Sequence, residues 1–150
     1  MRYLLTASLA ALILLTACGS RPDSVDDFYL HTLTLPGGRT IRVEEVFDNV
    51  NILRGLMFRK SLAPDRGMLF VYPHPDHYQT FMYQVQIPLD IIWMDSGRRI
   101  LQIDENAQPC MTQASQCRKY GGPDLVSYAL EIDAGLARKY GLGVGQILQW

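Results

Sequence analysis

The sequence has little net charge, few cysteines and none of the common catalytic signatures. The formal net charge is −1 at pH 7, and no run of like charges is longer than two residues. Because nucleic-acid binding requires a basic face, no nucleic-acid partner is expected. The chain also lacks a Gly-x-Ser-x-Gly elbow, a phosphate-binding loop, a dinucleotide fingerprint and a His-Glu-x-x-His motif. These absences weaken the case for the common enzyme classes, and no cofactor is predicted.

The longest apolar stretch is too short to remain across a bilayer. Residues 3–17 are rich in Leu and Ala, contain no ionisable carboxylate or amine, and follow Met1-Arg2. As a helix they would extend about 22 Å, whereas the hydrocarbon core of a membrane is roughly 30 Å thick. The pattern predicts a cleaved export signal rather than a permanent transmembrane helix.

The export signal ends in a sequence that resembles the lipobox of bacterial lipoproteins, Leu15-Thr16-Ala17-Cys18-Gly19. The resemblance implies that Cys18 is alkylated by a diacylglyceryl group before cleavage. The alternative is an ordinary secretory signal with a chance cysteine. Gly19 stands where an aspartate would resemble an inner-membrane retention signal, so the expected location is the cell envelope, at the outer membrane and facing the periplasm.

These features divide the chain into a signal peptide (residues 1–17), a lipidated polar tether (residues 18–27) and a single domain (residues 28–150). A domain of about 120 residues can bury roughly two-thirds of its unfolded surface in one core. The lipid anchor predicts the membrane as one partner. A small-molecule or envelope-protein ligand is the other partner expected.

Two further cysteines are expected to form a disulfide. Cys110 and Cys117 lie in a polar, irregular stretch and would face an oxidising compartment. Closing this loop would stabilise the fold by about 2.5 kcal/mol in the entropic model. Thiol–disulfide catalysis is the less favoured alternative because the spacing is not Cys-x-x-Cys, and a thiol–metal site is the third.

Period-two patterning predicts a mainly β domain. Residues 29–35 and 39–46 flank Pro36-Gly37-Gly38, which favours a hairpin, and residues 91–94 and 100–103 form a second hairpin. Further strands are expected in this order along the chain: residues 68–72, 80–85, 125–132 and 146–150.

Two short helices complete the prediction, one over residues 50–59 capped by Asn49 and one capped by Asp133 and ending at Tyr140. The expected fold is an antiparallel β-sandwich or partly open barrel with one or two short helices.

Several sequence blocks resemble the family known as domain of unknown function 192. The blocks are residues 54–59 with 67–70, residues 88–92, residues 106–120 and residues 128–145. Their order and spacing are more specific than any one block. The resemblance covers most of residues 28–150 and implies a small, mainly β domain, often exported, without a settled biochemical activity.

One segment departs from the family pattern. Relatives often have Phe-Trp-Met-Lys-Asn-Thr where this chain has Thr80 to Val85, so Tyr83, Gln84 and Val85 replace the lysine, asparagine and threonine. Any polar ligand contact that those three residues make in relatives is in doubt here.

Four residues are the candidate ligand-binding set: Arg54, Met82, Tyr83 and Asp90. A carboxyl group beside apolar strands can have a perturbed pKa and act as a base, and an arginine can hold a carboxylate or phosphate. The alternative is structural: Asp90 pairs with an arginine such as Arg54 or accepts hydrogen bonds from the backbone.

The aromatic residues offer a second hint of a binding site. They would line a groove if one face of the sheet is open, and otherwise they pack the interior. The five are Tyr72, Tyr78, Phe81, Tyr83 and Trp93.

Histidines cluster only once, in Pro73 to Tyr78, where His74 and His77 with Asp76 could hold a metal ion helped by methionines. Solvent-facing histidines and methionines that fill the core are the favoured alternative.

The leading hypothesis is a non-enzymatic, lipid-anchored envelope protein that binds a ligand or a partner. The alternatives are a hydrolytic enzyme centred on Asp90 and Arg54 and a periplasmic metal-handling protein that uses His74 and His77.

Overall fold

The computed structural model describes residues 30–150. The predicted signal peptide, the lipid-attachment residue Cys18 and the tether lie outside the described residues. The elements, in chain order, are β1 (Leu30–Thr34), β2 (Thr40–Val46), α1 (Asn49–Arg54), β3 (Arg66–Asp76), β4 (Gln79–Phe81), β5 (Leu89–Met94), β6 (Ile100–Ala107), the 3₁₀ turn η2 (Ala114–Gln116), β7 (Lys119–Gly121), β8 (Val126–Asp133) and α2 (Leu136–Lys139).

Six strands form one mixed sheet in the order β1-β2-β3-β8-β5-β6, and β4 pairs with β7 in a separate two-stranded sheet. All pairs are antiparallel except β2 with β3. The prediction of a mainly β fold with one or two short helices is confirmed, and the sheet is mixed and does not close into a barrel.

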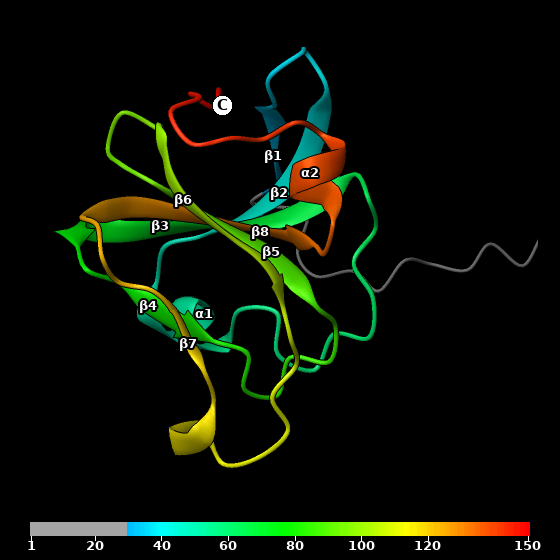
Figure 1. Ribbon diagram of the computed structural model, residues 1–150, viewed down its shortest axis with the longest axis vertical. Coiled ribbons are helices and arrows are strands. Elements are labelled where there is room, and N and C mark those ends of the chain that lie inside the picture. The colour runs from blue at the N-terminus through cyan, green and yellow to red at the C-terminus, as the bar shows by residue number, and fades with distance from the viewer. Residues whose placement is uncertain (1–29) are drawn as a thin grey trace, which may run out of the picture.

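The large sheet is covered on both faces, and each face has its own apolar core. Along β5, Leu89, Ile91 and Trp93 belong to one core, whereas Ile92 and Met94 belong to the other. This division follows from the alternation of side chains along a strand. The segments around α1, β4 and β7 cover the first face, and α2 with the C-terminal segment covers the second (Figure 1).

Both predicted hairpins are confirmed, β1–β2 and β5–β6. The predicted terminal strand over residues 146–150 is wrong, since Ile147 and Gln149 make only isolated bridges. The strand predicted over residues 80–85 is shorter, ending at Phe81.

The predicted helices are displaced and shorter. Asp48, not Asn49, caps α1 by accepting hydrogen bonds from the backbone N–H groups of Val50 and Asn51. The helix ends at Arg54 because the next residue, Gly55, has φ +46° and ψ −134°, outside the helical region. Likewise α2 begins after Gly135, not after Asp133.

The predicted Cys110–Cys117 disulfide is present. Its first cysteine is hydrogen bonded to the segment that follows β4: the Cys110 N–H donates to the Met82 carbonyl (2.9 Å) and the Cys110 carbonyl accepts from Gln84 N–H (3.1 Å). The disulfide loop therefore supports that segment from outside. Within residues 30–150, no helix is both long and apolar enough to cross a membrane.

Candidate functional site

A cavity of about 390 Å³ lies between α1 and the first face of the large sheet. Its walls come from α1 and the turn after it, from β3, and from β4 and the residues that follow β4, with one residue of β8 in addition. The lining is mainly apolar and aromatic, and it includes Ile52, Met57, Phe70, Met82 and Val85. A cavity of this size and character is typical of small-molecule sites.

Glu131 is the one residue that β8 contributes to this cavity. It lies between Met68 of β3 and Ile91 of β5 in the register of the sheet, so only uncharged side chains flank it there. The residue is 5% exposed. Burial raises the pKa of Glu131 from its ordinary value of 4.5 to about 8. The carboxyl group is therefore mostly protonated at neutral pH.

No side chain or backbone group among residues 30–150 forms a hydrogen bond or ion pair with the Glu131 carboxyl group. Buried polar side chains in folded proteins nearly always have such a partner, because an unpaired one loses its interactions with water. A carboxyl group that lines a cavity without a protein partner is available to a ligand.

Four further aromatic residues line the cavity. Tyr72 and Tyr78 stack with ring centroids 3.8 Å apart and an interplanar angle of 9°. Phe81 and Tyr83 lie in a tilted arrangement with centroids 6.5 Å apart. Burial raises the pKa of Tyr72, with smaller contributions from the nearby Glu131 and Tyr78. The Tyr72 hydroxyl thus stays protonated and can donate a hydrogen bond near Glu131.

Three of the four predicted ligand-binding residues line this cavity: Arg54, Met82 and Tyr83. Met82 is buried at 2% exposure, whereas Arg54 is exposed at the end of α1. In the part of the chain that the structure describes, no carboxylate forms an ion pair with Arg54. The cavity thus has a solvent-exposed cation among its lining residues.

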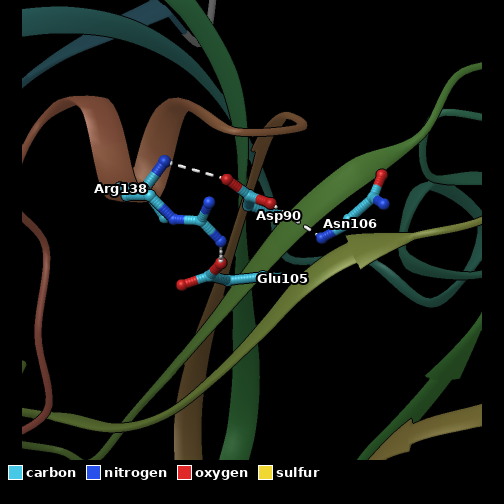
Figure 2. A network of polar contacts seen from close by, with 5 residues as sticks. Asp90, Glu105, Asn106 and Arg138 are labelled. Carbon is cyan, nitrogen blue, oxygen red and sulfur yellow. Dashed lines mark hydrogen bonds and ion pairs between the residues drawn. The ribbon is translucent and has the colours of Figure 1, made fainter.

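Asp90, the fourth predicted residue, does not line the cavity. It alternates with Leu89 and Ile91 along β5 and lies opposite Ile132, which belongs to the core on the α2 side. Its fully buried carboxyl group accepts hydrogen bonds from the backbone N–H groups of Asn106 (2.9 Å) and Ala137 (2.8 Å) (Figure 2).

Asp90 therefore joins β6 to α2, which is the structural alternative considered from the sequence. Figure 2 also shows the ion pair between Glu105 and Arg138 at the edge of this network. Because Asp90 and Arg54 belong to opposite faces of the sheet, they do not form a shared catalytic site.

The histidine cluster makes one contact within its own segment and one with the loop before β8. His77 Nδ1 lies 3.0 Å from the Gly122 carbonyl oxygen, and His74 lies 3.7 Å from Asp76. Within residues 30–150, no group of three or more His, Cys, Asp and Glu residues is arranged to hold a metal ion. The aromatic groove suggested by the sequence does exist, except that Trp93 is buried in the core and donates to Asp104 (2.8 Å).

Glu131 was not among the residues predicted from the sequence. The available signal was an acidic residue between Leu130 and Ile132 in an otherwise apolar strand. A charged residue in a strand that is buried on both faces is unusual enough to mark a site.

Comparison with known proteins identifies the family. Residues 32–150 match domain of unknown function 192, described as an uncharacterised ACR. The chain belongs to this family. No curated protein matches the chain.

Two solved structures are similar over most of the fold. A protein of unknown function from Novosphingobium aromaticivorans is 32% identical in sequence, and its structure superposes with a TM-score of 0.70. The similarity covers 79% of this chain and 82% of the Novosphingobium chain. A Sinorhizobium meliloti protein, labelled a candidate transcription regulator, is also 32% identical, with a TM-score of 0.69. The similarity covers 79% of this chain and 89% of the Sinorhizobium chain.

Proposed function

We propose that the protein is a lipid-anchored envelope protein that binds a small organic molecule in the cavity between α1 and the large sheet. The observation that carries the proposal is Glu131, a carboxyl group buried in that cavity without a protein partner. Such a group is poorly solvated and has no protein partner, so it reduces the stability of the fold unless a ligand interacts with it.

The shape and lining of the cavity also support binding. About 390 Å³ accommodates a molecule of metabolite size, and the apolar and aromatic lining would remove most of its surface from water. The few polar groups, among them Glu131, the Tyr72 hydroxyl and Arg54, would orient the ligand. The disulfide loop supports one wall through Met82 and Gln84, which preorganises the site.

The location rests on the sequence alone. The apolar stretch at residues 3–17 and the lipobox-like Cys18 support export and acylation. Mass spectrometry of the native protein tests this part directly: it should begin at Cys18 and carry the mass of the attached acyl chains. A chain that still begins at Met1 and has an unmodified Cys18 would contradict the anchored location. It would not bear on the proposed binding in the cavity.

Binding itself is tested by thermal-shift screening of the full-length protein in detergent against a library of small organic fragments. Thr80 lines the cavity and is partly buried, so Thr80→Phe should fill part of the space and abolish or weaken the stabilisation by the ligand.

Thr32→Phe is the matched control. It adds the same side chain at an exposed position on β1, outside the lining of the cavity, and should bind fragments like the unmodified protein. The proposal is contradicted if no fragment stabilises the protein, or if every stabilising fragment binds equally well to Thr80→Phe.

A further inference from the structure

The arrangement of Glu131 and the tyrosines narrows the class of ligand. Glu131 provides one acidic group within the cavity, and Tyr72, Tyr78, Phe81 and Tyr83 provide aromatic rings along the same walls. An aromatic ring attracts a cation through its negative face, and the attraction is stronger when water is excluded. A carboxyl group that is neutral in the empty cavity ionises when a positive charge comes close.

We propose that the ligand of this cavity carries an organic cation, an ammonium or quaternary ammonium group, which pairs with Glu131 and packs against the aromatic rings of Tyr72 and its neighbours. This inference rests on the proposed function, because it assigns the chemistry of the molecule that the same cavity binds.

Other ligand classes fit the site less well. An anionic ligand would bring a negative charge into a poorly solvated cavity in which Glu131 could stay only neutral and the exposed Arg54 is the one cation among the lining residues. A metal ion requires several oxygen, nitrogen or sulfur ligands, whereas Glu131 is the single acidic residue among the cavity's lining residues and no histidine or cysteine lines it. A neutral ligand could accept a hydrogen bond from protonated Glu131. The test must therefore distinguish a neutral ligand from a cationic one.

The charged and titratable residues that line the cavity with Glu131 come from two elements, β3 and α1, and from two connecting segments. Tyr72 lies on β3 and interacts electrostatically with Glu131, and the other three line the same cavity: Tyr78 in the turn after β3, Tyr83 in the segment after β4, and Arg54 at the end of α1. Arg54 is exposed, so water screens its charge from the interior of the cavity. The neighbours on β3 and β5 in the sheet register, Met68 and Ile91, carry no charge.

The test compares choline with 3,3-dimethylbutan-1-ol, in which a carbon atom replaces the charged nitrogen while the shape stays the same. Both are titrated by NMR against the full-length protein in a detergent without quaternary ammonium groups. Choline should bind more tightly than the alcohol, and its affinity should rise about ten-fold between pH 7 and pH 9 as the carboxyl group ionises. Choline itself does not change charge over this range.

Glu131→Gln keeps the shape of the side chain and removes its charge. In this variant, choline should lose at least ten-fold in affinity together with the pH dependence, while the alcohol should bind as well as before or better. The pH profile of the unmodified protein provides the same evidence independently, should the variant fold poorly.

Each alternative result has a defined meaning. If the alcohol binds as tightly as choline, or if affinity falls above pH 8, then Glu131 acts as a protonated donor to a neutral ligand; the inference is wrong while the proposed binding function stands. If neither compound binds, the organic-cation inference is also wrong. The fragment screen with Thr80→Phe then decides the proposed function separately.

Discussion

Two buried acidic residues lie on opposite faces of the same sheet in very different surroundings. Asp90 is fully buried but accepts two backbone hydrogen bonds, whereas the Glu131 carboxyl group forms no hydrogen bond or ion pair within residues 30–150. The first arrangement stabilises a junction of the fold, and the second leaves a chemical group open to a ligand. Substitutions at the two residues should therefore change the stability of the fold in different ways.

Glu131 should make the stability of the ligand-free protein fall as the pH rises. Its pKa is raised in the folded state, so between pH 4.5 and about 8 the unfolded chain releases a proton that the folded protein keeps. The free energy of unfolding is therefore lowered by roughly 4–5 kcal/mol across this window. Urea denaturation at a series of pH values should show this fall, and Glu131→Gln should remove it.

Glu105→Gln is the control for that measurement, because Glu105 is a partly exposed acidic residue paired with Arg138 at the surface. It should retain the pH dependence of the unmodified protein. A profile for Glu131→Gln that runs parallel to that of the unmodified protein would show that Glu131 is not held in its neutral form.

Asp90→Asn should destabilise the fold without affecting the cavity. The amide keeps one acceptor but turns its NH₂ group toward the second backbone N–H, which then has no acceptor in a buried position. A loss of about 2–3 kcal/mol is expected from urea denaturation. Unchanged fragment binding should accompany it, and a loss of binding at unchanged stability would instead assign Asp90 to the site.

The prediction of Asp90 as a ligand residue shows a limit of sequence patterns. All six residues of β5 are buried, so the alternation does not reveal which face of the strand contains the cavity. Arg54, Met82 and Tyr83 reach the cavity from segments whose relative positions depend on the whole fold. Glu131 could have been singled out as an acidic residue in an apolar strand, but its missing partner is visible only in the folded structure.

At the scale of elements, the small β4–β7 sheet holds one side of the cavity against the core. The Asp104 carboxylate accepts from the Trp93 indole N–H (2.8 Å) and from the Gly121 N–H of β7 (3.0 Å). Gly121 has φ +79°, and a Cβ atom there would lie 2.6 Å from the Trp93 ring. Glycine is therefore required at this contact.

Gly121→Ala should lower the free energy of unfolding by roughly 2–4 kcal/mol, since it adds both backbone strain and a clash with a buried ring. Gly37→Ala is the matched control, because Gly37 also has a positive φ (+84°) but nothing within 4 Å of the added methyl group. It should cost about 1 kcal/mol. Equal losses in thermal or urea denaturation would show that β7 does not pack against Trp93 as described.

The elements that period-two alternation predicted well were the hairpins, where turn residues mark both strand ends. It failed where tertiary contacts decide the conformation. The β7 strand is only three residues long and follows the disulfide loop, so the sequence contains no alternating pattern long enough to predict it. Residues 146–150 alternate like a strand, yet Ile147 and Gln149 find only single bridging partners at the edges of β1 and the β5–β6 turn.

At the scale of the whole molecule, the large sheet separates two sides that are packed differently. The α2 side is closed by α2 and the C-terminal segment and contains Asp90, while the α1 side contains the cavity (Figure 1). The family and the mainly β architecture were predictable from the order of sequence blocks and from strand patterning. The cavity was not, because its walls come from segments distant in the sequence.

The central claim is that a ligand binds on the α1 side of the sheet, and the methionines allow this claim to be tested directly. Met57 and Met82 line the cavity, whereas Met94 lies in the core on the other face and Met111 is exposed on the disulfide loop. In ¹³C-methyl NMR spectra of the full-length protein, a bound fragment should shift the Met57 and Met82 signals and leave those of Met94 and Met111 in place. Signals of Met57 and Met82 that stay unmoved by every fragment that binds the protein would contradict the account.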